Sequence, residues 1–175
     1  MSDVPPPTPE PVALPTDRAA AREMGARLIR QFEGCVLHPY QDQAGVWTIG
    51  IGSIRLADGS PVCADTPPIS EDEAVALCEA EMDRIDDQVD ASLRVYAPVC
   101  WHAALYSFAY NEGPGAERSS STLRLLNAGQ PQQAADALLL WDKVRDPATG
   151  ALVTDRGLLN RRRIERAVAL GLVTP

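Results

Sequence analysis

Three side chains in the first third of the chain could together break a glycosidic bond. Glu33 ends a helical pattern, Asp42 follows in a loop, and Thr48 lies in an alternating, strand-like segment. Breaking such a bond requires one carboxylic acid to protonate the leaving oxygen and a second carboxylate to activate water or stabilise the developing cation. Because a helix end is drier than a loop, we expect Glu33 to be the acid and Asp42 the base. The Thr48 hydroxyl could hold the attacking water.

A helix and a small antiparallel sheet must bring these side chains together. Thr16 or Asp17 can cap the helix, along which apolar residues recur at helical spacing. From about 37 to 65 the pattern changes to strand residues with turn signals. Gly50 and Gly52 alternate in this segment, and the missing side chains allow close approach of another backbone or of a ligand.

A long helix is predicted next. Ser70 and Glu73 fit a capping box at its start, and its apolar positions continue to about residue 94. At about 1.5 Å per residue it would span roughly 35 Å, enough to connect two lobes. The rest of the chain is predicted to form a helical bundle, with turns at 128–129 and 146–150 and helices at 98–110, 121–127, 131–141 and from 157 or 158 to 170.

The order and spacing of the three candidate residues resemble the phage-type lysozymes, the endolysin family of T4 lysozyme (glycoside hydrolase family 24). The run Ile49-Gly50-Ile51-Gly52 follows them directly. The resemblance covers about residues 18–172 and continues in order through 69–74, 104–113, 121–129 and 157–162.

The resemblance implies an α+β, mainly α fold with two lobes. A small antiparallel β-sheet lobe would be joined by a long helix to a helical lobe. The expected lysozyme-like catalytic domain is 17–175, preceded by a proline-rich tail or linker at 1–16. Within that domain the expected parts are a small lobe at about 33–68, a linking helix at about 70–94, and a helical lobe at about 95–172 together with the N-terminal helix.

The function implied is that of a muramidase. Such an enzyme cuts the β-1,4 bond between N-acetylmuramic acid and N-acetylglucosamine in peptidoglycan, with inversion at the anomeric carbon, and lyses the host cell. The resemblance assigns Glu33 as the acid, Asp42 as the residue that orients or activates water, and Thr48 as its helper.

Further residues are expected to support or line the cleft. By the same resemblance, Arg161 matches an arginine that forms an ion pair with the acid, and Asn111 falls where relatives have an amide. Tyr40 is expected to be a framework residue beside the aspartate. The glycines at 50 and 52 complete the supporting set.

Two other functions remain open. A lytic transglycosylase needs only one acid and forms a 1,6-anhydro end, although the retention of Asp42 and Thr48 favours hydrolysis. A non-catalytic peptidoglycan-binding or phage structural module could share the fold, because a fold alone does not establish activity.

Composition limits the partners. The net charge of −8 and the pI near 4.7 argue against a nucleic-acid partner, since affinity for phosphates comes mostly from Lys and Arg. No apolar run approaches the roughly 20 residues of a membrane span, and no conventional signal peptide is visible. We therefore expect a monomer without stable membrane insertion, held in the host cytoplasm until a holin releases it to the periplasmic cell wall.

No cofactor or metal is expected. The four cysteines lack close Cys-x-x-Cys pairing and the histidines that a zinc site would need. The simplest interpretation is buried, reduced thiols that behave as small apolar residues. A bridge between Cys63 and Cys78 is the alternative for an oxidising compartment.

Overall fold

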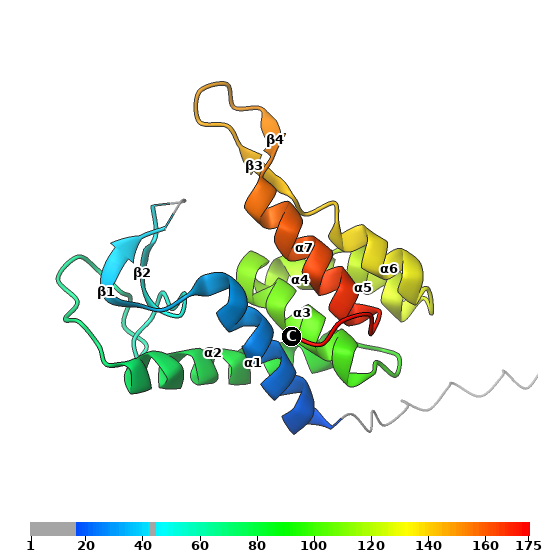
Figure 1. The fold of residues 1–175 in the computed structure, drawn as a ribbon, viewed down its shortest axis with the longest axis horizontal. Helices are drawn as coiled ribbons and strands as arrows, with labels where there is room; N and C mark the ends of the chain where they lie inside the picture. Colours follow the sequence, from blue (N-terminus) through cyan, green and yellow to red (C-terminus); the bar gives the residue numbers. More distant parts are fainter. Residues whose placement is uncertain (1–16, 43–44) are drawn as a thin grey trace, which may run out of the picture.

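A long helix connects a small β lobe to a larger helical lobe in the computed structural model, which describes residues 17–42 and 45–175 (Figure 1). The segment 1–16, predicted to be a tail, lies outside the described residues. In chain order the elements are α1 (Arg18–Glu33), β1 (Val36–Gln41), β2 (Trp47–Gly50), α2 (Glu71–Ser92), α3 (Val99–Glu112), α4 (Pro114–Ser119), α5 (Ser121–Asn127), α6 (Pro131–Leu138), β3 (Lys143–Arg145), β4 (Leu152–Thr154) and α7 (Arg156–Ala169).

Local signals set both ends of α1. The Asp17 side chain accepts a hydrogen bond from the backbone N–H of Ala20 and caps the first turn. At the other end, Gly34 has a φ of 66°, which an L side chain rarely adopts. Leu28 and Ile29 are buried in the core, where α1 packs against α3. This packing fixes the helix end that carries Glu33.

The predicted antiparallel sheet is present but short. β1 pairs with β2, and Tyr40 lies directly opposite Thr48 in their register. Directly opposed residues in an antiparallel pair have neighbouring side chains. The pairing therefore places the framework tyrosine beside the candidate hydroxyl.

Gly50 lies where β2 meets α2. Its φ is +65°, and a Cβ at this position would lie 3.1 Å from the Cβ of Ala74. A Gly50→Ala substitution should lower the free energy of unfolding by about 1–2 kcal/mol for the backbone alone, with a further loss from crowding. Gly59→Ala is the matched control, because Gly59 also has a positive φ but no atom within 4 Å. In urea unfolding, Gly50→Ala should lower the free energy of unfolding more than Gly59→Ala does. Equal decreases in the two variants would show that the contact with α2 does not contribute.

The helices that join and fill the two lobes follow the sequence signals closely. α2 begins with the predicted capping box, in which the side chains of Ser70 and Glu73 bond each other's backbone N–H groups. α3 is buried over Trp101 to Ala109 and packs against α1, α2, α4 and α7. It is the central helix of the core. Within the described residues, no helix has the length and apolar character that a bilayer span requires.

The second half contains two elements that the sequence did not predict. α4 begins at Pro114, just after the predicted helix at 98–110 and where no helix was predicted. Proline is well suited to a first helical turn. The predicted turn at 146–150 is the tip of a hairpin formed by β3 and β4. Both strands are three residues long and mostly exposed, so they lack the apolar alternation that marks a strand. α6 also ends at Leu138, before the predicted 141.

The four cysteines only partly match the prediction of buried, reduced thiols. All four are free, so Cys63 and Cys78 form no bridge in this structure. Cys78 is buried, but Cys35 and Cys63 are exposed. The prediction of buried thiols was wrong for these two because both lie in the small β lobe, which is too thin to cover every apolar side chain.

Glu117 on α4 should make stability depend on pH. Burial raises the pKa of its carboxyl to about 7, against the opposing effects of the Ser92 hydroxyl and Arg118. The unfolded chain therefore loses this proton at lower pH than the folded chain, and stability falls as pH rises towards 7. Glu117→Gln should raise the free energy of unfolding by about 2–3 kcal/mol at pH 8 and by little near pH 4.5. Urea unfolding at both pH values measures the difference, and a pH-independent gain would contradict the assignment.

Candidate active site

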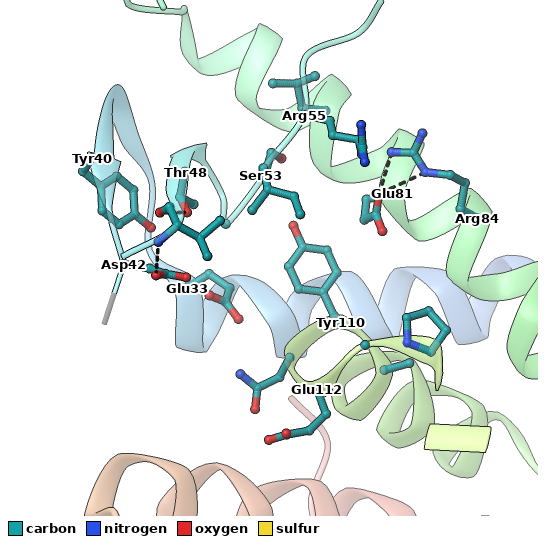
Figure 2. Close-up of a pocket in the computed structure, with 18 residues that line it drawn as sticks. Glu33, Tyr40, Asp42, Thr48, Ser53, Arg55, Glu81, Arg84, Tyr110 and Glu112 are labelled. Carbon is teal, nitrogen blue, oxygen red and sulfur yellow. Dashed lines mark hydrogen bonds and ion pairs between the residues drawn. The ribbon is translucent and has the colours of Figure 1, made fainter. Parts of the chain in front are cut away.

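A cleft of about 440 Å³ lies between the β lobe and the end of α3 (Figure 2). The predicted residues that line it are Glu33, Tyr40, Asp42, Thr48, Gly52 and Asn111. Two predicted residues lie elsewhere. Gly50 packs against Ala74 of α2, and Arg161 lies behind Glu33. Both therefore lie outside the lining of the cleft.

Glu33 occupies a confined position at the end of α1. Its side chain is 22% exposed, and the Nη1 atom of Arg161 lies 2.5 Å from its Oε1. On the other side, a Cβ at Gly52 would lie 3.2 Å from Oε2. The backbone of the turn after β2 thus reaches the carboxylate only because position 52 has no side chain. This explains the glycine that the sequence analysis placed in the supporting set.

Asp42 lies in a wetter environment. The residue is exposed, and its Oδ1 accepts a hydrogen bond from the backbone N–H of Val46 at 2.8 Å. This bond connects the residue after β1 to the residue before β2, so the Asp42 carboxylate is held in place at the ends of the two strands. The expected difference in burial between Glu33 and Asp42 is present.

Tyr40 and Thr48 form the wall beside the two carboxylates. Burial, followed by the charges of Glu33 and Asp42, raises the pKa of the Tyr40 phenol, so the phenol stays protonated. Thr48 is buried, and its hydroxyl donates to the backbone carbonyl of Val46 at 3.1 Å. A hydroxyl that donates once keeps lone pairs to accept from water.

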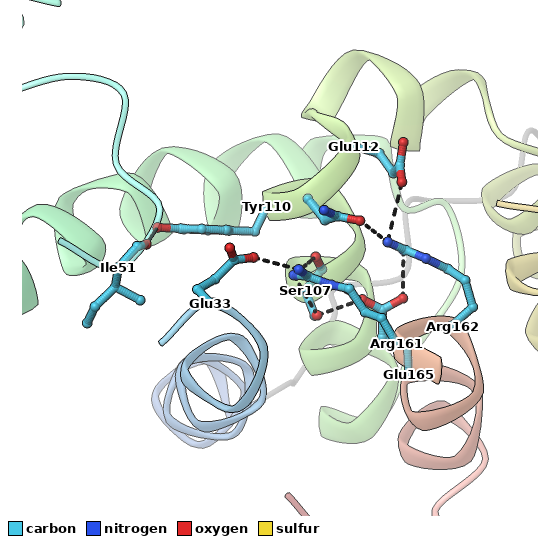
Figure 3. Close-up of polar contacts among 9 residues, drawn as sticks. Glu33, Ile51, Ser107, Tyr110, Glu112, Arg161, Arg162 and Glu165 are labelled. Carbon is cyan, nitrogen blue, oxygen red and sulfur yellow. Dashed lines mark hydrogen bonds and ion pairs between the residues drawn. The ribbon is translucent and has the colours of Figure 1, made fainter. Parts of the chain in front are cut away.

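Behind Glu33 lies a buried ionic network, shown in Figure 3. Arg161 donates from Nη1 to Glu33 and from Nε to Glu165 at 3.1 Å, while Nη2 donates to the backbone carbonyl of Ser107. The other Glu165 oxygen accepts from Arg162 Nη1 at 2.7 Å. Glu165 and Arg162 are both fully buried.

The network continues to the far wall of the cleft. Nη2 of Arg162 donates to the side-chain oxygen of Asn111 and lies 3.4 Å from Glu112 Oε1. Asn111 is thus anchored from behind, while the residue lines the cleft in front. One carboxylate, Glu165, links the arginine behind Glu33 to the arginine behind Asn111.

The sequence analysis missed Arg162, Glu165 and Ser107. A run of arginines usually marks a solvated helix face, and burial of two of them depends on packing against α3. One signal was available, because Glu165 stands four and three residues after Arg161 and Arg162, the spacings that place side chains on one helix face.

Tyr110 closes the cleft between the lobes. Its hydroxyl donates to the backbone carbonyl of Ile51 at 2.5 Å, and its ring carbon would lie 3.3 Å from a Cβ at Gly52. Burial is the main cause of a raised pKa for this phenol, so it remains neutral. The bond ties α3 to the turn after β2, which fixes the two walls relative to each other.

A two-lobed fold whose cleft is lined by Glu33 and Asp42 in unlike surroundings is that of a lysozyme-type glycoside hydrolase. Residues 30–165 match the phage lysozyme family. The chain belongs to this family, as the sequence predicted.

Individual relatives agree with the family assignment. The endolysin of Salmonella phage P22 is 35% identical over 147 residues, which cover 83% of this chain and 94% of the relative. The SAR-endolysin of Enterobacteria phage PA-2 is 32% identical over 138 residues, or 79% of this chain and 77% of the relative.

A solved structure extends the agreement to the fold. The endolysin from Escherichia coli O157:H7 phage FAHEc1 has a TM-score of 0.78 at 36% identity, covering 87% of this chain and 94% of that chain. The predicted fold class and the prediction of an endolysin-type muramidase are thereby confirmed.

Proposed function

We propose that this lysozyme hydrolyses the β-1,4 bond between N-acetylmuramic acid and N-acetylglucosamine with inversion, using Glu33 as acid and Asp42 as base, in host cell lysis. One observation carries the proposal. Glu33 and Asp42, two of the four carboxylates that line the cleft, come from different elements, and one is confined against an arginine while the other is exposed. Such unlike surroundings divide a carboxylate pair into acid and base.

In the proposed reaction, the Glu33 carboxyl donates its proton to the glycosidic oxygen as the bond to the anomeric carbon breaks. Asp42 accepts a proton from a water molecule that Thr48 holds, and this water attacks the opposite face of the sugar. One water is consumed, and the new reducing end has the inverted configuration. Tyr40 supports the two carboxylates, and Asn111 binds the glycan from the opposite wall.

Glu33 is partly buried, and its Oε1 lies 2.5 Å from the guanidinium of Arg161. The charged groups around Arg161 therefore affect the proposed acid, Glu33.

Asp42→Asn should reduce the release of reducing ends from purified murein by about 10²–10⁴-fold, the usual contribution of a general base. The amide oxygen can still accept the hydrogen bond from Val46, so the loop should remain intact. Asp58→Asn is the matched control, because Asp58 also closes an exposed turn by accepting a backbone N–H, from Ser60 at 2.9 Å. Equal activity of the Asp42 variant and this control would remove Asp42 from the mechanism.

Product analysis separates the proposal from the alternatives. Mass spectrometry of the released muropeptides should show hydrated reducing ends, whereas 1,6-anhydro ends would identify a lytic transglycosylase. NMR of the first-formed anomer tests inversion. A non-catalytic module would bind murein without releasing reducing ends.

The proposed partners follow from the substrate. Peptidoglycan strands are the substrate, and the protein is proposed to act as a monomer, without a nucleic-acid partner. We propose release from the host cytoplasm to the periplasmic wall through a holin. The SAR-endolysins among the relatives make membrane-linked release the alternative route.

A further inference from the structure

Glu165 is a carboxylate in the core that no step of the proposed reaction uses. It is fully buried and accepts three hydrogen bonds, from Ser107 Oγ at 2.6 Å, Arg161 Nε at 3.1 Å and Arg162 Nη1 at 2.7 Å. A buried carboxylate is costly unless it is paired and hydrogen-bonded. The structure meets this cost with donors from two helices.

The Glu165 contact fixes how Arg161 meets the acid. The guanidinium is planar, and each of its three nitrogens has its own acceptor, with Glu165 on Nε and Glu33 on Nη1. Its face lies 4.8 Å from the centre of the Phe32 ring. Without the Glu165 acceptor, the plane could turn and present a second N–H to Glu33.

Glu165 also lies between two adjacent arginines, whose charges favour its carboxylate form against the burial that raises its pKa. Burial lowers the pKa of Arg162, and the charge of Glu165 opposes this effect. With Glu165 neutral, Arg162 would keep an ion pair with the partly exposed Glu112, and the two buried cations would act more strongly on Glu33.

We propose that Glu165 is a positioning residue that orients Arg161 and balances the charge of the arginine pair, and so preserves the proton on the catalytic acid Glu33. This inference rests on the proposed role of Glu33. On this inference, the buried network sets the pH range in which the enzyme hydrolyses murein, in addition to stabilising the fold.

The charges around Glu33 give the direction of the effect. The groups that face it are Tyr40 from β1, Cys78 from α2, Tyr110 from α3, and Arg161 and Arg162 from α7, and Asp42 lines the same cleft. Burial raises the pKa of both tyrosines and of the cysteine, which leaves them neutral. Arg161 and Arg162 are the cations behind Glu33, while Arg55 and Arg84 line the same cleft as Glu33. Removing the Glu165 charge strengthens the pull of Arg161 and Arg162 on the Glu33 proton.

The test is the pH profile of murein hydrolysis. The high-pH limb is the part of the profile in which kcat falls as pH rises. In Glu165→Gln this limb should move to lower pH by roughly one unit, so that kcat at a given pH on the limb should be about tenfold lower than in the wild type. Arg162→Gln should move the limb to higher pH. The double variant Arg162→Gln/Glu165→Gln keeps the original net charge and should return the limb to its wild-type position.

Two controls make the result decisive. Ser107→Ala removes a hydrogen bond to Glu165 without changing charge, so it should affect melting temperature but not the limb. If Glu165→Gln does not fold, comparison of Arg162→Gln with the double variant gives the same information. A folded Glu165 variant with the wild-type profile, or a double variant that stays shifted, would overturn the inference. If Glu33→Gln loses activity, the proposed function stands even when one of these two results overturns the inference about Glu165.

Discussion

Glu33→Gln should lower kcat on murein by about 10²–10⁴-fold, because the amide cannot donate the proton that the leaving oxygen requires. The substitution keeps the shape of the side chain, and the amide oxygen can still accept from Arg161. Binding to murein and the melting temperature should therefore change little. The release of reducing ends, measured at saturating substrate, gives the effect on kcat.

Glu79→Gln is a suitable control for that experiment. Glu79 is an exposed glutamate on α2 and does not line the cleft. Its variant should lyse permeabilised Gram-negative cells at the wild-type rate. If Glu33→Gln does the same, another group must protonate the leaving oxygen and the mechanism is wrong.

Arg161→Ala should have the largest effect on stability. The substitution leaves Glu165 fully buried and Glu33 partly buried without their shared cation. Removing one partner of a buried ion pair typically costs about 3–5 kcal/mol. For a chain of this size, that loss corresponds to a fall in melting temperature of roughly 6–20 °C. Calorimetry or thermal circular dichroism measures it.

The same variant should also change the pH dependence of any remaining activity. Without the guanidinium, Glu33 keeps its proton to higher pH, so the high-pH limb should move upward. Arg163→Ala is the matched control, because Arg163 is the last arginine of the same run and is exposed. An unchanged pH profile together with an unchanged melting temperature would show that the Arg161 contact has no role.

Local signals were sufficient for much of the fold. Asp17, Gly34 and the Ser70 capping box act within a few residues of themselves, so helix ends could be predicted from sequence. The hairpin of β3 and β4 was missed, because its strands are short and bear exposed side chains. A turn such as 146–150 has the same sequence signals whether or not the residues on either side of it pair as β-strands.

The sequence by itself determined the candidate acid, base and hydroxyl, because Glu33, Asp42 and Thr48 stand close together along the chain, on adjoining elements. Only the tertiary structure decided what surrounds the acid. Arg161, Arg162 and Glu165 are brought to Glu33 and Asn111 by the packing of α7 against α3, across more than a hundred residues of chain for the pair of Arg161 and Glu33. The charged residue types in a sequence do not reveal which of them are buried, and burial is what makes Arg161, Arg162 and Glu165 the surroundings of the proposed proton donor, Glu33.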